Sequence, residues 1–319
     1  MISTGYNITG LCCHPAGFLR LVPLITFLTF LAATPQVTAQ ATYTGADGVT
    51  VDISDRSRIV SIGSAVTETI FALGAEENLV AVDESSLYPE ETAAIPKVSF
   101  TRNLSAEGVL SMEPTLILAS GAAGPETALR QIRSTGAPLL IVSADETVDA
   151  AFERVEQLGA VLGREERAME VSRRLAMDLE RAATLHDMLE SRPVVLFIYA
   201  RGPNHLMVAG NRTSAKTMIE LAGGVNAFDE FEGYKPLTPE AVVAVNPSVI
   251  LMMNSGLQSV GGTEWVRQAP GVSLTDAAKN NRIHSMDGSY LLGFGPRMGQ
   301  AVLDLMEFLH PGTEIRQAE

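Results

Sequence analysis

Short apolar runs alternate with amphipathic segments through the first half of the chain. RIVSIG, residues 58–63, is rich in β-branched residues and predicts a strand. The segment SAVTETIFALGA that follows has apolar residues at helical spacing, with Ser64 as its N-cap and Gly74 near its end. NLVAVD, residues 78–83, predicts a second strand, and LSAEGVLSMEPTLILAS and GPETALRQIRSTGAPLLIVS each predict a helix followed by a strand. This alternation is typical of an α/β domain with a mainly parallel sheet.

The pattern changes to long helical periodicity in residues 147–190. Helix-breaking residues are few there, and Gly159 and Gly163 are the only positions at which the helix is expected to be weak. We therefore predict one long helix, with a kink allowed at these glycines, that carries the chain some tens of ångströms. PVVLFIYA, residues 193–200, then restarts the alternation of strand and helix.

The restart contains a repeat. LSAEGVLSMEPTLIL, residues 104–118, aligns without a gap on LTPEAVVAVNPSVIL, residues 237–251. A match of this kind at corresponding points of two halves indicates duplication. We predict two pseudo-symmetric α/β lobes, residues 40–146 and 191–319, joined by the long helix of residues 147–190. The cleft between the lobes is then the expected ligand site.

The N-terminal segment is of a different kind. Its apolar run, Leu21–Ala33, is too short to span a membrane and is followed by small residues. This predicts a signal peptide, residues 1–39, cut after Ala39. Cys12 and Cys13 precede the apolar run, so neither is a lipid-attachment cysteine, and the mature protein has no cysteine. An exported chain without disulfides indicates the bacterial periplasm.

Composition excludes one class of partner. The chain has 319 residues, of which 46% are hydrophobic, so a sizeable core is expected. The formal net charge of −14 argues against nucleic acid, because a phosphate-backbone binder needs a basic face. Small anions are still compatible, since a local pair of arginines can hold them.

The catalytic motifs that we sought are absent or incomplete. No GxSxG, HExxH or CxxC occurs, and GNRTSAKT departs from a phosphate-binding loop because Ala215 replaces the second glycine. We interpret it as a helix start capped by Thr213 or Ser214. The acidic pair Asp83 and Glu84 has no nucleophile beside it and is expected to be solvated. We predict that the protein is not an enzyme.

Two residues remain as candidate ligand contacts. Tyr88 follows a predicted strand in the loop DESSLYP, where a large aromatic is either a plain surface residue or a group held out to a ligand. His205 lies in the loop RGPNHLM after another strand and could face the cleft. The other histidines have no ligand spacing, and LLGFGPRMGQ is interpreted as a turn that starts the last helix.

The motifs together resemble the periplasmic haem-binding proteins of bacterial haem ABC importers. The resemblance rests on RIVSIGSAVTETIFALGA, DESSLYP, TRNLSAEGVLSMEPTLILASGAAGP, YARG, MVAGNRTSAKTMIELAGGVNAF and MDGSYLLGFGPR, and it covers residues 58–309. In that family the tyrosine of the xSxYP loop is the axial ligand of haem iron, which implies this role for Tyr88. Ferric iron is a hard acid and a phenolate is a hard anionic donor, so the chemistry agrees.

The resemblance also implies how the rest of haem is held. Arg102 and Arg201 are the arginines expected to hold the propionates, with His205 as a further contact. Relatives carry a histidine near the position of Arg201 as a second iron ligand, so arginine here favours one five-coordinate haem. Many relatives have an arginine where this chain has Ser255, which leaves the hydrogen-bond donor to the phenolate unassigned.

The implied function is periplasmic capture of ferric haem and its delivery to an ABC permease dimer in the inner membrane. A monomer, small lobe movements and an outer-membrane haem receptor upstream are expected with it. Glu107 and Glu240, equivalent in the repeat, would dock on the permease, although an acid in a first helical turn is also explained by the helix dipole. A ferric siderophore or cobalamin on the same scaffold is the alternative, and an exported α/β enzyme is the remote one.

Overall fold

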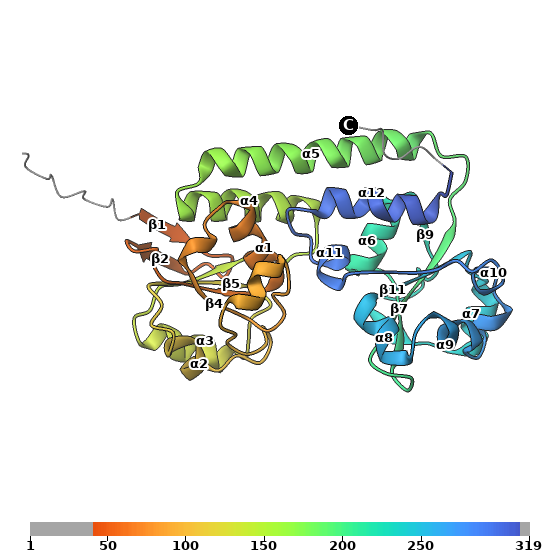
Figure 1. The fold of residues 1–319 in the computed structure, drawn as a ribbon, viewed down its shortest axis with the longest axis horizontal. Helices are drawn as coiled ribbons and strands as arrows, with labels where there is room; N and C mark the ends of the chain where they lie inside the picture. The colour runs from red at the N-terminus through yellow and green to blue at the C-terminus, as the bar shows by residue number, and fades with distance from the viewer. Residues whose placement is uncertain (1–40, 313–319) are drawn as a thin grey trace, which may run out of the picture. The chain divides into compact units, whose positions relative to one another are not determined.

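The computed structural model describes residues 41–312, which belong to one compact unit. Its N-terminal lobe is built on a four-stranded sheet (Figure 1). The elements of this lobe, with η marking short 3₁₀ helices, are β1 (Ala41–Thr44), β2 (Thr50–Ile53), β3 (Ile59–Ile62), α1 (Ser64–Ala72), η1 (Glu76–Asn78), β4 (Leu79–Val82), η2 (Glu90–Ala94), α2 (Ala106–Leu110), β5 (Leu116–Ser120), α3 (Glu126–Ser134) and β6 (Leu139–Val142).

The strands of this sheet are parallel and lie in the order β4-β3-β5-β6. Both faces are covered, so the strands are continuous apolar runs rather than alternating ones. Ile59 and Leu118 pack on the side of α1 and α4, whereas Val60 and Ile117 pack on the side of α2 and α3. The predicted α/β class with a mainly parallel sheet is therefore confirmed for this lobe.

The C-terminal lobe is built on a larger, mixed sheet. Its order is β10-β8-β7-β11-β12 with β9 also beside β7; β8 and β10 run antiparallel to their neighbours. The elements are β7 (Val194–Ala200), β8 (Leu206–Ala209), α6 (Ser214–Leu221), β9 (Val225–Asn226), β10 (Tyr234–Pro236), α7 (Pro239–Val245), β11 (Val249–Met253), α8 (Asn254–Val260), α9 (Thr263–Gln268), η3 (Val272–Leu274), α10 (Asp276–Lys279), β12 (Ile283–Met286), α11 (Gly288–Leu292) and α12 (Met298–Leu309).

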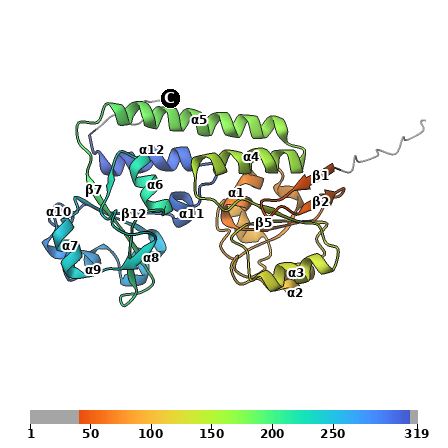
Figure 2. The ribbon, with the colours of Figure 1, turned by 180° about the vertical axis from the view of Figure 1, so that it is seen from behind.

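The predicted long helix is two helices, α4 (Val148–Leu162) and α5 (Glu165–Asp187), that pack side by side (Figures 1 and 2). Gly163 adopts a left-handed conformation, with φ of 66°, and ends α4. A Cβ on Gly159 would lie 2.4 Å from the Cβ of Ala168, so this glycine lets the two helices approach closely. The connecting helix is thus α5 alone. The boundaries expected for the lobes stay predictions.

The repeat is present as matching elements. Helix α2 and strand β5 of one lobe correspond, at the same sequence offset, to α7 and β11 of the other. Both helices are capped in the same way: the Ser105 hydroxyl accepts from the Gly108 amide at 3.1 Å and the Thr238 hydroxyl from the Ala241 amide at 3.3 Å. Each strand also lies between two parallel neighbours. The two-lobed, pseudo-symmetric architecture agrees with the prediction.

Some predictions fall outside the described residues, namely the signal peptide of residues 1–39, its cleavage after Ala39 and the two cysteines. Within residues 41–312, no helix is both long enough and apolar enough to cross a membrane. The segment GNRTSAKT is a helix start, as predicted. The Thr213 hydroxyl caps α6 by accepting a hydrogen bond from the Lys216 amide.

Candidate ligand-binding site

The loop that carries Tyr88 is organised by a buried carboxylate. Asp83 accepts hydrogen bonds from the Gly63 amide at 2.9 Å, from the Thr101 hydroxyl at 2.6 Å and from the hydroxyls of Ser85 and Ser86. Its side chain is fully buried, so the expectation of a solvated acidic pair is wrong for Asp83, although Glu84 is exposed. A buried carboxylate needs such donors, and here they fix the course of the loop.

Large apolar side chains project from this loop and its neighbour. Leu87 is 68% exposed, Tyr88 42% and Phe100 61%. The two loops lie against each other, because the Glu84 amide donates to the Ser99 carbonyl at 2.8 Å and the Lys97 ammonium to the Ser86 carbonyl at 2.7 Å. Neighbouring exposed apolar side chains of this kind mark an interaction surface or the rim of a ligand-binding site.

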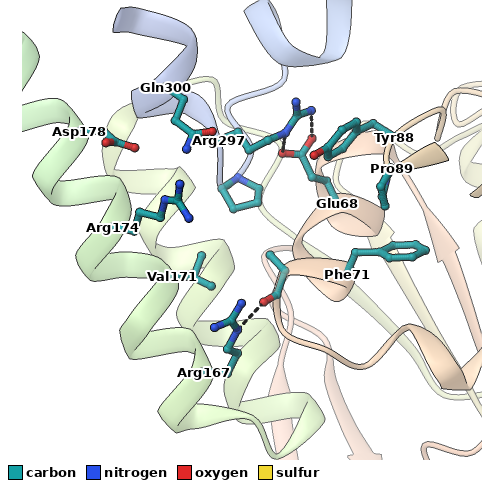
Figure 3. A pocket seen from close by; sticks show the side chains of 12 residues that line it. Glu68, Phe71, Tyr88, Pro89, Arg167, Val171, Arg174, Asp178, Arg297 and Gln300 are labelled. Atoms are coloured by element: carbon teal, nitrogen blue, oxygen red, sulfur yellow. Dashed lines mark hydrogen bonds and ion pairs between the residues drawn. The ribbon is translucent and has the colours of Figure 1, made fainter. Parts of the chain in front are cut away.

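Tyr88 lines a cavity of about 440 Å³ (Figure 3). The cavity is bounded by α1, by the flank of α5 and by the start of α12, and its volume is typical of small-molecule sites. Phe71 and Val171 give it apolar walls, while Arg167 and Arg174 of α5 supply positive charge. With Arg297, three arginines face the two carboxylates Glu68 and Asp178, so the lining combines apolar walls with a small excess of positive charge.

Arg297 stands at the centre of this site. Its guanidinium donates to both carboxylate oxygens of Glu68, at 2.8 and 3.0 Å, and lies 3.3 Å from the centroid of the Tyr88 ring (Figure 3). The Tyr290 ring lies on it as well, at 4.6 Å. Burial lowers the pKa of the Arg297 guanidinium, but the hydrogen bonds and charge of Glu68 outweigh this and raise it above its usual value. Arg297 thus keeps its charge and joins the two lobes.

Arg102 lies elsewhere in the cleft. It is exposed and lines a separate cavity of about 310 Å³ between the lobes, together with Ser64 of α1 and with Met253 and Ser289 of the C-terminal lobe. Residues of both lobes therefore line this cavity.

Arg201 and His205 share one turn after β7. The Arg201 amide donates to the His205 carbonyl at 3.0 Å, and the Arg201 guanidinium donates to the Tyr199 hydroxyl. Both side chains are exposed, and neither lines the Tyr88 cavity. Ser255 is exposed in the first turn of α8 and does not line that cavity either. The guanidinium that contacts Tyr88 here is that of Arg297.

Glu107 and Glu240 are exposed in the first turns of α2 and α7. Both helices cover the face of their sheet that is opposite α5, since Val109 and Val242 pack into the cores on that side. The equivalence of the two glutamates within the repeat is therefore preserved in space.

Sequence reasoning missed Glu68 and Arg297. Glu68 is the only charged residue of α1, and its side chain is 6% exposed. A single acidic residue in an otherwise uncharged, buried helix predicts a cationic partner elsewhere in the chain, because a buried charge needs a counter-ion. Arg297 lies in the glycine-rich turn that was interpreted only as a helix start, and 229 residues separate the two partners.

Two α/β lobes with cavities between them, joined by one helix, define a bilobal binding protein. A family model described as periplasmic binding protein matches residues 59–290. The chain belongs to this periplasmic binding protein family.

Solved structures of similar chains give a finer picture. The periplasmic heme-binding protein RhuT from Roseiflexus sp. RS-1 is 40% identical, with a TM-score of 0.78 over 80% of this chain and 98% of that chain. The periplasmic heme-binding protein BhuT, in complex with two hemes, is 36% identical, with a TM-score of 0.75 over 79% of this chain and 97% of that chain. A vitamin B12-binding protein of Vibrio parahaemolyticus is 22% identical over 78% of this chain and 88% of its own length.

Proposed function

We propose that the protein captures ferric haem in the periplasm and delivers it to an ABC permease dimer in the inner membrane. The observation that carries the proposal is Tyr88, a half-exposed phenol on the wall of a cavity, held by a loop whose course Asp83 fixes. The likeness to heme-binding proteins at up to 40% identity supports the same ligand.

In this proposal the phenolate of Tyr88 is the axial ligand of the ferric iron. Phenolate oxygen is a hard donor that suits Fe(III) and is a known haem ligand. The Arg297 guanidinium, 3.3 Å from the ring centroid, stabilises the negative charge that the phenol carries when it binds iron. Because Glu68 holds this guanidinium from the other side, the charge stays in place while haem enters and leaves.

The residues that contact the propionates and the ring of haem are assigned from the chemistry of those groups. Arg102 and Arg201 would hold the propionates, and His205 is the further contact on the C-terminal side. Leu87 and Phe100, both exposed beside Tyr88, would cover the apolar ring. We propose one haem per chain, since a single exposed tyrosine lines the cavity; the two hemes bound to BhuT define the competing stoichiometry.

Delivery is assigned to the face that carries Glu107 and Glu240. A two-fold permease that meets a pseudo-two-fold partner needs equivalent contacts on both lobes, and the repeat supplies them. We propose a monomer that receives haem from an outer-membrane receptor system. No part of this function requires catalysis.

Cobalamin is the second candidate, because a vitamin B12-binding protein is among the relatives. A ferric siderophore is the third. Both would be bound without a coordinating tyrosine, so the absorption spectrum of the bound ligand separates them from haem.

The test is a titration of the mature protein with haemin, with cyanocobalamin and a ferric siderophore as parallel ligands. We expect a Soret shift that saturates near one equivalent and a phenolate-to-iron charge-transfer band. Saturation at two equivalents would show that the chain binds two haems instead of one. No shift with haemin, together with tight binding of cobalamin, would show that cobalamin is the ligand. Incubation with haemin and a reductant, monitored for ring cleavage, separates a carrier from an enzyme.

A further inference from the structure

Two large apolar side chains of the C-terminal lobe face water close to Glu240. Val243 of α7 is 43% exposed, and Leu274 of η3 is 61% exposed. Val243 follows Glu240 by three residues, so the two side chains lie on one face of α7. Exposed apolar side chains rimmed by charged residues mark interaction surfaces. Val243 and Leu274 form what we call the apolar patch.

The segment that contains η3 runs along α7, which brings the two residues of the patch together. At the start of α7, a Cβ on Gly271 would lie 2.5 Å from the carbonyl oxygen of Pro239. At its end, the Asp276 amide donates to the side-chain oxygen of Asn246 at 2.9 Å, and the Asn246 side-chain amide donates to the Asp276 carboxylate at 3.0 Å. The exposed leucine of η3 lies between these two contacts. It is therefore beside the middle of α7, the part of the helix that contains Val243.

Glu240 adds a free carboxylate to this surface. Within residues 41–312 it makes no ion pair, although Glu264 of α9 and Asp276 of α10 are both paired with basic residues. Such a carboxylate can pair with a basic side chain of another protein. The surface therefore fits a partner that places a basic side chain next to an apolar one.

The N-terminal lobe has no such patch at the equivalent place. In the repeat, Val243 corresponds to Leu110 of α2, which is half-buried and packs against the core of its own lobe. Helix α3 packs beside α2, and its exposed residues are all polar or charged: Glu126, Thr127, Arg130, Gln131 and Ser134. The two lobes therefore differ in the chemistry that surrounds their equivalent glutamates.

We infer that the apolar patch is a docking surface for one subunit of the ABC permease, and that the two lobes dock by different chemistry. The inference rests on the proposed function, in which Glu107 and Glu240 face the two permease subunits. Salt screens the contact of an exposed carboxylate but not the burial of apolar surface. The C-terminal lobe therefore supplies the firmer contact, and the N-terminal lobe docks through polar groups.

The experiment measures the affinity of the haem-loaded mature protein for the purified cognate permease in lipid nanodiscs. Leu274→Ser and Val243→Ser should each weaken this affinity at least about fivefold, because apolar surface that docking buries is lost. The double variant should also lose more affinity than the wild type when NaCl is raised from about 0.1 to about 0.5 M. Met177→Ser is the matched control. It lies on α5, at the opposite face of the sheet, is 62% exposed and should bind the permease normally.

A haemin titration of each variant separates this inference from the proposed function. Both patch variants should give the Soret shift of the wild type, since neither residue lines the Tyr88 cavity. Unchanged permease affinity of both patch variants, with that shift present, overturns this inference and leaves the proposed function standing. A wild-type dimer that Leu274→Ser converts into a monomer, with permease affinity unchanged, also overturns it, because the patch would then join two copies of the chain. No Soret shift for the wild type overturns the proposed function.

Discussion

The Glu68 carboxylate and the Arg297 guanidinium form a two-point ion pair between the N-terminal and C-terminal lobes, with donor–acceptor distances of 2.8 and 3.0 Å. Glu68 is almost fully buried, and Arg297 stacks on the ring of Tyr88. An ion pair that joins the two lobes therefore also contacts the proposed iron ligand.

Removal of the charge of Glu68 should destabilise the protein. Glu68→Gln leaves the partly buried Arg297 without its counter-ion, and breaking such a pair costs about 3 kcal/mol in the free energy of unfolding. Denaturation by urea measures this change. Glu170→Gln, which breaks the exposed pair with Arg167, is the matched control and should cost about 0.5 kcal/mol or less. A loss for Glu68→Gln as small as that of the control would show that the pair is not needed for stability.

Replacement of Tyr88 by phenylalanine removes the donor oxygen and keeps the ring under Arg297. The charge-transfer band should vanish and haemin affinity should fall at least about tenfold, while residual binding persists through ring burial and propionates. Tyr43→Phe is the control, since it removes a hydroxyl that donates to the Ala160 carbonyl, away from the cavity. An unchanged spectrum for Tyr88→Phe would mean that another residue holds the iron, and His205 would then be replaced next.

The paired glutamates should be needed for transport and not for binding. Glu107→Ala combined with Glu240→Ala should leave haemin affinity intact while uptake through the cognate permease fails. Glu126→Ala combined with Glu264→Ala is the matched control, because these acids also lie in first helical turns, of α3 and α9. Normal uptake by a folded, loaded Glu107 and Glu240 double variant would return both residues to the role of helix-end charges.

Stability should fall when the pH is lowered from about 6.5 to about 5.5. Burial lowers the pKa of His284, which stacks on Phe308, and of His310 below their ordinary value of 6.5. The unfolded chain then binds protons at a higher pH than the folded chain, so stability is complete above about pH 6.5 and is lost as the pH falls through the folded pKa values. Urea midpoints across this range measure the slope. His310→Gln should flatten it, and an unchanged slope would assign the effect to other groups.

The strands and the repeat are predictable because both faces of the parallel sheet are covered, which leaves continuous apolar runs such as residues 116–119 in the sequence. The break between α4 and α5 is not predictable in the same way, because helical periodicity continues on both sides of Gly163. A single glycine in the left-handed conformation is enough to reverse the chain there. Tyr88 could be identified from its motif. The ion pair of Glu68 with Arg297 joins residues 229 positions apart, and local patterns carry no information at that range.

Helix α5 contributes to two cores at once: Ala168 is buried in that of the N-terminal lobe, and Leu175, Ala182 and Leu185 are buried in that of the C-terminal lobe. Neither lobe can lose its core without exposing part of a helix that the other needs. Thermal unfolding should therefore be one cooperative transition, with equal calorimetric and van't Hoff enthalpies, although the molecule has two lobes. An isolated lobe, expressed without α5, would lack part of its own interior.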